Sequence, residues 1–310
     1  MKSAISVFFN IDRTYMAILS PHENSLSLDY VEATRKRIDL ENIFDVNNDE
    51  GVIELREFIN SVSNQINRVS VTIPAESVFV AQFPGKKGMD EDQLNKLVNL
   101  EIKQAYPQFN TDEFVSNVIP LEKRKNGMEM MLASIMQKDI VETCKEIFKD
   151  YLPITNIEVS QMNAHTAFIY NYPESLEKTV MILGVQDQFI DVSIIKNSMP
   201  AYYNLLSFSD IDKEKFGSIV EAEYKKVLNE VVDTIDGIYF FGTGLTKRVF
   251  LAGYNMANGL GVESGRLNAF RMVKPNVEER LKNYCKIMQH VFPPCVGAAI
   301  PAYHDRIRLL

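Results

Sequence analysis

The stretch LGVQDQFIDVSII, residues 183–195, decides the fold, and FNIDRTYMAIL, residues 9–19, repeats its pattern near the N-terminus. Each stretch is typical of an apolar strand, a short polar turn and a second strand. When the two are laid over each other with Phe9 on Leu183, the apolar residues of their strands fall in step. A chain that contains the same hairpin twice is expected to contain an internal duplication.

Composition excludes several classes of protein. With 310 residues, of which 46% are apolar and 24% charged, the chain is long enough for two lobes. The net charge of −8 argues against a nucleic-acid partner, which needs a clustered basic surface. Three scattered cysteines and four histidines show no metal-ligand spacing, so we expect neither a disulfide framework nor a metal site. No signal peptide and no apolar run of about 18–20 residues is recognisable, and a cytoplasmic protein without direct membrane insertion is expected.

The order of predicted elements supports the duplication. Hydrophobic periodicity in the first half predicts three strands, a helix and extended segments, at residues 5–11, 15–19, 26–33, 49–66 and 69–83. In the second half it predicts three strands, a helix, a strand and a helix, at residues 180–185, 189–195, 201–206, 212–233, 237–241 and 246–258. A last strand at residues 266–270 and a last helix at residues 277–292 complete the pattern.

An additional module interrupts the first half. Its pattern predicts a helix, a hairpin and a helix, at residues 90–106, 113–121, 128–134 and 138–151. The basic run Lys123-Arg124-Lys125-Asn126-Gly127 is expected to be a solvated hairpin turn, because Asn-Gly favours such turns.

These segments predict three domains. The first lobe consists of residues 1–83 and 154–174, and the inserted α+β subdomain of residues 84–153. The second lobe spans residues 175–292, and a C-terminal helix at residues 293–303 is expected to return to the first lobe.

Two α/β lobes that each open with a tight β-hairpin resemble the actin-like ATPase superfamily. The resemblance implies an actin-like, ribonuclease H-like two-lobe fold. Members typically carry Asp-Ile-Gly-Thr/Ser-Thr in the first hairpin and Asp-Ile-Gly-Gly-Gly-Thr-Thr-Asp in the second. Glycines let backbone N–H groups approach phosphate oxygens, and carboxylates hold magnesium. The cofactor implied by the resemblance is therefore ATP with magnesium.

The chain departs from these motifs. Asn10 and Gly184 align with the leading aspartates, while polar side chains replace the glycines. These changes favour a chain that is not an ATPase, although weak nucleotide binding through the third, Gly-rich turn stays open. No catalytic residue and no metal ligand is assigned. The residues aligned with the nucleotide site are Asn10, Asp12, Thr14, Gly184, Gln186, Asp187, Asp191, Gly242, Thr243 and Gly244.

The insertion narrows the resemblance to the type IV pilus assembly protein PilM family and its cell-division relative FtsA. The segments that carry it are Val71–Phe79, Leu100–Pro107, Asn156–Val159 and Pro293–Ile300. The resemblance implies a cytoplasmic scaffold, peripheral to the inner membrane through a partner. It would hold the N-terminal cytoplasmic tail of an inner-membrane protein in a groove between the first lobe and the insertion.

Other functions stay open at this point. An active ATPase or small-molecule kinase of the same superfamily would follow if a shift of one or two residues placed Asp12 in the catalytic position. A membrane-tethered filament protein is disfavoured, because residues 304–310 are too few for an amphipathic anchor. The resemblance also leaves formation of a homo-oligomer open.

Overall fold

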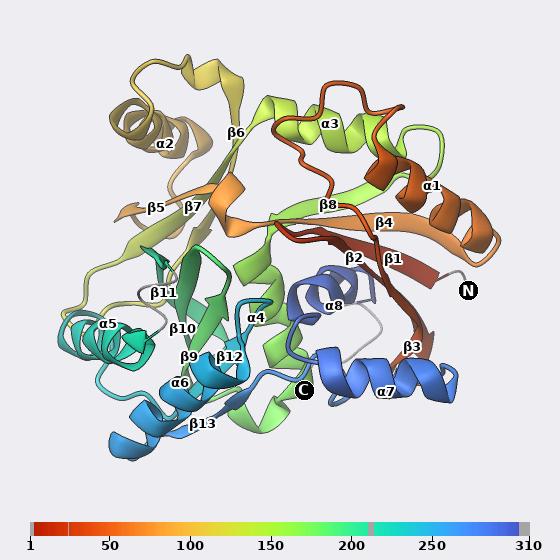
Figure 1. Cartoon of the computed structure of the whole chain (residues 1–310). Helices are drawn as coiled ribbons and strands as arrows, with labels where there is room; N and C mark the ends of the chain where they lie inside the picture. Colours follow the sequence, from red (N-terminus) through yellow and green to blue (C-terminus); the bar gives the residue numbers. More distant parts are fainter. Residues whose placement is uncertain (1–2, 24, 210–213, 304–310) are drawn as a thin grey trace. The chain divides into compact units, whose positions relative to one another are not determined.

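The structure is a computed structural model that describes residues 3–23, 25–209 and 214–303 (Figure 1). The chain divides into two compact units. Unit 1 consists of Met1–Ser77, Lys138–Pro173 and Asn268–Leu310, and unit 2 of Val78–Gln137 and Glu174–Leu267. The C-terminal segment at residues 304–310, which the sequence analysis considered as a membrane anchor, lies outside the described residues. No helix in the described ranges is long and apolar enough to cross a membrane.

Unit 1 is built around one mixed sheet. Its elements are β1 (Ser3–Phe9), β2 (Thr14–His22), β3 (Ser25–Ala33), α1 (Glu50–Val62), β4 (Ile66–Ile73), α3 (Lys138–Phe148), β8 (Ile154–Val159), α4 (Ser160–Asn171), β14 (Lys274–Pro275), α7 (Glu279–Met288) and α8 (Pro293–Ala299). The six strands are ordered β14-β3-β2-β1-β4-β8 (Figure 1). β1 is antiparallel to β2 and parallel to β4.

The central strand β1 is buried along its whole length because both faces of the sheet are covered. On one face, Phe9 packs against Phe148 of α3, with ring centroids 6.3 Å apart. On the other face, Phe8 belongs to a core shared with Val296 and other residues of α8. Because side chains alternate between two covered faces along this strand, apolar residues occur on both faces, and five of the seven residues at 3–9 are apolar.

Helices α4 and α8 cross at Gly297, where their backbones are in close contact. A Cβ atom added to Gly297 would lie 1.7 Å from the carbonyl oxygen of Asn163 and 3.1 Å from the amide nitrogen of Ala167. Only a residue without a side chain allows this approach. The Asn163 amide donates to the Thr72 hydroxyl at 2.8 Å, and that hydroxyl donates to the Pro294 carbonyl at 3.2 Å. These contacts join α4, β4 and α8.

Unit 2 contains the second repeat and the insertion. The second repeat is β9 (Thr179–Val185), β10 (Phe189–Lys196), β11 (Met199–Ser207), α5 (Phe216–Glu230), β12 (Gly237–Phe241), α6 (Lys247–Gly259) and β13 (Glu263–Arg266). The insertion is β5 (Phe79–Pro84), α2 (Glu91–Ala105), β6 (Phe114–Pro120) and β7 (Met130–Gln137). Its three strands form a separate sheet of order β5-β7-β6.

The order β11-β10-β9-β12-β13 matches β3-β2-β1-β4-β8 of unit 1 strand for strand. The predicted duplication is therefore confirmed at the level of topology. In this correspondence α3 takes the place of α6, between the fourth and fifth strands of a repeat. The insertion leaves the first repeat after β4 and returns to it at α3.

The insertion packs on the second repeat through polar contacts. The Gln82 side chain of β5 donates to the Tyr203 carbonyl of β11 at 2.5 Å. The basic turn contributes as well, because the Lys125 ammonium donates to the Leu228 carbonyl at 2.6 Å and the Lys125 amide to the Val231 carbonyl at 2.9 Å. Residues 123–127 form the predicted hairpin turn, but Lys125 also caps the C-terminal end of α5, where a positive charge is favourable.

The structure differs from the predicted elements at residues 266–270, and it groups α3 with unit 1. The strand predicted at residues 266–270 is wrong: β13 ends at Arg266, and an Asn268 side chain that accepts from the Phe270 amide at 2.9 Å turns the chain away. The domain boundary predicted at residue 153 stays a prediction, but the contacts group α3 with unit 1. Arg56 of α1 contributes to this grouping, because it donates to the carbonyls of Glu146 and Ile147 at the end of α3.

We expect Gly297→Ala to destabilise unit 1 by about 3 kcal/mol, since the added methyl group collides with backbone and not with a movable side chain. Thermal unfolding followed by circular dichroism measures the effect. Gly259→Ala in α6 is the control, because a Cβ atom there meets nothing within 4 Å. Equal melting temperatures for the two variants would contradict the tight crossing of α4 and α8.

Candidate functional site

The first hairpin turn lies in unit 1 and spans residues 10–13. It closes where the Asn10 amide donates to the Arg13 carbonyl at 3.0 Å, directly after the last strand pair, Phe9 with Thr14. Asn10 and Thr14 are buried, with exposed fractions of 1% and 0%, whereas the Asp12 side chain is exposed. Of the two candidates in this turn and Thr14 directly after it, only Asp12 thus presents its side chain to solvent.

The Asp12 carboxylate accepts hydrogen bonds from two side chains of its own hairpin. Asn10 Nδ2 donates to one carboxylate oxygen at 2.9 Å, and the Tyr15 hydroxyl donates to the other at 2.7 Å. Burial and this hydrogen bond to Asp12 raise the pKa of Tyr15 above its usual value, so the hydroxyl stays protonated and keeps donating. The carboxylate is consequently oriented by protein groups of its own hairpin.

The second hairpin turn lies in unit 2 and spans residues 186–189. The Gln186 amide donates to the Phe189 carbonyl at 2.9 Å, the same closing bond as in the first turn. By the geometry of the turns, Asn10 therefore corresponds to Gln186. The sequence alignment, which paired Phe9 with Leu183, had matched Asn10 with Gly184, two residues earlier. That alignment is wrong as a superposition of the turns, because it matched residue types without knowledge of the strand register.

Gly184 consequently lies inside strand β9, within the strand predicted at residues 180–185, and does not correspond to Asn10. Its partner across the sheet is Asp191 of β10. A Cβ atom at Gly184 would lie 2.6 Å from the Phe241 ring and 3.1 Å from the Asp191 Cβ, so the glycine makes room for these side chains. Asp191 is 1% exposed, and its carboxylate accepts from the Tyr203 hydroxyl at 2.7 Å. Two candidates of the second lobe are thus buried inside its sheet.

The third turn, Gly242-Thr243-Gly244, packs against the second hairpin within unit 2. Gly242 has φ of 108°, and a Cβ atom there would lie 2.2 Å from the Val185 carbonyl oxygen. A Cβ atom at Gly244 would lie 2.5 Å from the Gln186 carbonyl oxygen, and the Gly244 amide donates to the Val185 carbonyl at 2.9 Å. Both glycines are therefore required by contacts between protein backbones, whatever ligand binds.

A side-chain hydrogen bond reinforces this contact. The Thr243 hydroxyl donates to Gln186 Oε1 at 2.9 Å, and Gln186 is 2% exposed. Asp187, at the tip of the turn, has an exposed side chain. In the register of the strands, Gln186 takes the place of Asn10, which is the position of the leading aspartate in the family pattern. Here the Gln186 amide, bound by Thr243, stands where the pattern has a carboxylate, which does not fit the magnesium-holding position of that pattern.

The ten candidates are divided between the units, with Asn10, Asp12 and Thr14 in unit 1 and the others in unit 2. No group of three or more His, Cys, Asp or Glu side chains that could hold a metal ion occurs in the part of the chain that the structure describes. Sequence reasoning missed Tyr15 and Tyr203, which hold Asp12 and Asp191. Their strand-like alternation predicted only that they are buried or half-buried, and no sequence signal identified the carboxylates as their partners.

We expect Gly244→Ala to lower the stability of the nucleotide-free protein by about 2 kcal/mol, because the methyl group would displace the Gln186 backbone. Urea unfolding without added nucleotide measures the change. Gly265→Ala in β13 is the matched control in the same unit, since its nearest neighbour is 4.0 Å away. An unchanged stability of Gly244→Ala would show that the third turn is open and does not pack on the second hairpin.

Comparison with known proteins identifies the architecture. No family model and no curated protein matches the chain. Among solved structures, it is similar to a chain of the PilM-PilN type IV pilus biogenesis complex, with a TM-score of 0.68 and 13% identity over 98% of both chains. It is also similar to a protein of actin-like ATPase fold and unknown function from Bacteroides thetaiotaomicron, with a TM-score of 0.53 and 12% identity over 85% of this chain and 90% of that one. The chain therefore has the actin-like two-lobe α/β fold that its sequence predicted, and it resembles the PilM-PilN structure over almost its full length.

Proposed function

We propose that this chain is an actin-like scaffold in a type IV pilus-type assembly system, with weak nucleotide binding at most. In this proposal it lies in the cytoplasm and binds the N-terminal cytoplasmic tail of an inner-membrane protein, which keeps it at the membrane surface. The alternative is an active ATPase or small-molecule kinase of the same superfamily.

The observation that carries the proposal is the packing of the third turn on the second hairpin. Gly242 and Gly244, which would face a nucleotide in the family pattern, are already in contact with the backbone of Val185 and Gln186. The Gln186 side chain is bound by Thr243. The resemblance implies that such a turn packs against the adenosine of ATP, so ATP would have to displace these contacts before its adenosine reached the third turn, which lowers its affinity.

The carboxylates support the same conclusion. Magnesium bound with ATP is normally held by carboxylates and phosphate oxygens, with several water molecules retained. Asp191 is buried and accepts from Tyr203, while Asp12 accepts from Asn10 and Tyr15. If ATP with magnesium binds, Asp12 and Asp187 are the candidates that would face the ion, because their carboxylates are the exposed ones of the two turns.

The partner is inferred from two likenesses. The order of elements in the insertion resembles that of PilM, and the fold resembles a chain of the PilM-PilN complex over 98% of both chains. A scaffold needs a binding surface and a stable frame but no catalytic carboxylate. The proposal is consequently compatible with the loss of the leading aspartates, which an ATPase would have to retain.

We expect calorimetry with Mg-ATP to give no saturable heat up to about 1 mM nucleotide, which corresponds to a binding free energy weaker than about −4 kcal/mol. ATP turnover is expected to be the same in the wild type and in Asp12→Asn. This variant keeps a hydrogen-bonding group beside Asn10 and Tyr15 and so preserves the turn. Turnover in the wild type that Asp12→Asn abolishes would establish the alternative, an active enzyme.

We expect the tagged chain to sediment with membranes and to recover an inner-membrane protein that crosses the membrane once. A synthetic peptide copied from the cytoplasmic N-terminal tail of that protein should bind the purified chain and compete with the full-length partner. Removal of the tail should release the chain into the soluble fraction. Membrane association that persists without the tail, or recovery of no such protein, would contradict the scaffold proposal irrespective of the nucleotide result.

A further inference from the structure

Two Asn-Gly pairs occur in the sequence, Asn126-Gly127 and Asn258-Gly259, and the structure places them in different backbones. In such a pair the glycine amide nitrogen can attack the side-chain amide of the asparagine, because glycine has no Cβ atom to hinder the approach. Asn126-Gly127 lies in the basic turn between β6 and β7, and Asn258-Gly259 ends helix α6. All four residues are exposed, so access to water does not distinguish the two pairs.

The turn at Asn126 prepares its side-chain amide for this attack. The Met128 amide donates to Asn126 Oδ1 at 3.0 Å, which folds the side chain back along the peptide bond to Gly127. The same hydrogen bond polarises the side-chain carbonyl and would stabilise the negative charge that develops on Oδ1. The turn therefore keeps the carbonyl carbon of Asn126 close to the nitrogen that attacks it, which favours the intramolecular reaction.

One contact opposes the attack, but it lies at the surface. The Gly127 amide, which supplies the attacking nitrogen, donates to the Arg124 carbonyl at 2.8 Å. A hydrogen bond in an exposed turn adds little net stability, since water replaces it when it opens. Gly127 has φ of 81°, and a Cβ atom there would meet nothing within 4 Å, so no neighbouring group packs on this residue. The turn can therefore open at Gly127 without loss of packing.

The second pair is fixed by helical structure. Asn258 lies in α6, and its carbonyl accepts from the Gly261 amide at 3.1 Å just beyond the end of the helix. The Leu260 amide donates to the Met256 carbonyl at 3.1 Å, which continues the helical pattern past Gly259. In a helix each amide points along the axis toward an earlier carbonyl and not toward the preceding side chain. Attack at Asn258 thus requires the last turn of α6 to unfold first.

The reaction at Asn126 has defined products. The Gly127 nitrogen loses its proton and bonds to Asn126 Cγ, and the side-chain nitrogen leaves as ammonia, which gives a succinimide ring. Water then opens the ring at either of its carbonyls. One opening gives aspartate, and the other gives isoaspartate, in which the main chain runs through Cγ and is longer by a methylene group. Both products carry a negative charge that asparagine lacks.

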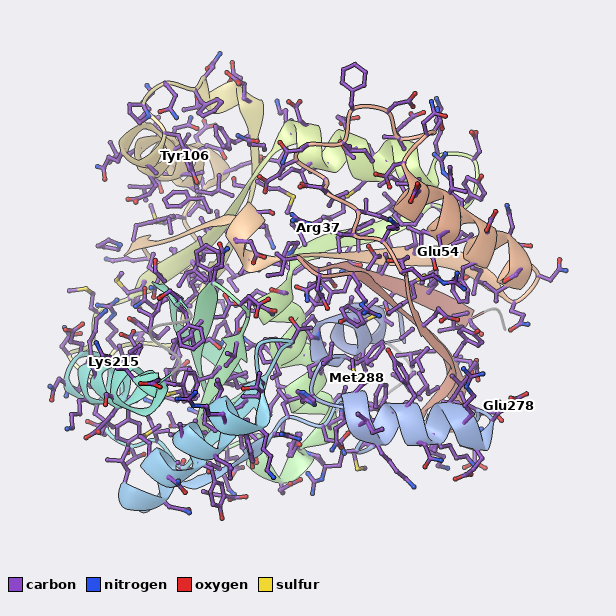
Figure 2. The ribbon with its side chains drawn as sticks, viewed as in Figure 1. Arg37, Glu54, Tyr106, Lys215, Glu278 and Met288 are labelled. Carbon is purple, nitrogen blue, oxygen red and sulfur yellow. The ribbon has the colours of Figure 1, made fainter. Side chains whose placement is uncertain are left out.

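The new charge and the longer main chain act on the neighbouring Lys125. Its ammonium donates to the Leu228 carbonyl at 2.6 Å and its amide to the Val231 carbonyl at 2.9 Å, at the C-terminal end of α5 (Figure 1). Figure 2 labels Lys215 at the opposite end of this helix. A carboxylate at position 126 competes with the Leu228 carbonyl for the ammonium, because a hydrogen bond between two charged groups is the stronger one.

We propose that Asn126-Gly127 is a site of spontaneous modification, which deamidates through a succinimide and whose aspartate and isoaspartate products release Lys125 from the end of α5. The only reactant that the site needs from outside is water. The site lies in the insertion and is separate from the residues aligned with the nucleotide site. It does not depend on the proposed scaffold function, because it uses contacts within unit 2 alone.

Incubation of the purified full chain in heavy-oxygen water tests the reaction. Peptide mass spectrometry should find a heavy oxygen atom in place of the side-chain nitrogen at Asn126, at a rate at least about tenfold greater than at Asn258. The rate should rise with pH, since the attacking nitrogen must lose its proton, and an isoaspartyl methyltransferase should label the isoaspartate product. In urea, where α6 no longer holds Asn258, the two pairs should react at similar rates.

Hydrogen exchange tests the consequence for α5. The incubated protein should exchange faster than fresh protein at residues 123–128 and in the last turn of α5. Asn126→Gln keeps a neutral amide but would need a larger, less favourable ring, so it should resist both changes. Asn126→Asp should show the faster exchange without incubation, whereas Asn95→Asp on the exposed side of α2 is the control with the same change in charge and should not.

Three results would overturn the proposal. The first is a rate at Asn126 no greater than at Asn258 in the folded protein. The second is a difference between the two pairs that persists in urea, since the local sequence and not the fold would then set the rates. The third is unchanged hydrogen exchange at the end of α5 in both the incubated protein and Asn126→Asp, because Lys125 would then have kept its contacts.

Discussion

The close approach of α4 and α8 at Gly297 is the constraint on which unit 1 depends. The carbonyl of Asn163 occupies the space that any side chain at position 297 would need. This contact brings α8 onto β1 and β4, where it covers one face of the sheet and buries Phe8. The first hairpin joins β1 to β2, and α8 contacts both strands. The strands that carry this hairpin are therefore covered by a helix from the far end of the sequence.

In unit 2, glycines also allow two backbone segments to come into close contact, here at the candidate nucleotide site. Gly242 and Gly244 bring the third turn against Val185 and Gln186, and a Thr243–Gln186 hydrogen bond closes the contact. The resemblance to actin-like ATPases implies that such a turn packs against adenosine. Here both glycines are in contact with protein backbone, and our proposal of weak nucleotide binding at most rests on this contact. A fold can keep its architecture after such a change, because its core depends on strand order and packing and not on the ligand.

Much of the architecture could be predicted from the sequence, because the duplicated hairpins and the helical periods are local patterns. The insertion was recognisable for the same reason. The site was predictable only in part. Gly184 was aligned with the leading aspartate because residue types were matched, whereas the ladder of hydrogen bonds places it opposite Asp191 inside the sheet. The partners of the carboxylates, Tyr15 and Tyr203, were missed because a tyrosine in a strand looks the same whether or not its hydroxyl is bound.

The sequence by itself determined the order of strands and helices, the repeat and the absence of the leading aspartates, since each depends on residue type and short-range spacing. Tertiary structure decided which groups meet. In the folded chain Asn10 corresponds to Gln186, and the third turn packs on the second hairpin. Helix α3 lies in unit 1 with the elements of the first repeat. Tertiary structure also paired the short strand β14 with Ser27 and Leu28 of β3, about 250 positions earlier in the chain. Such features depend on contacts between residues up to about 250 positions apart, and no local pattern encodes them.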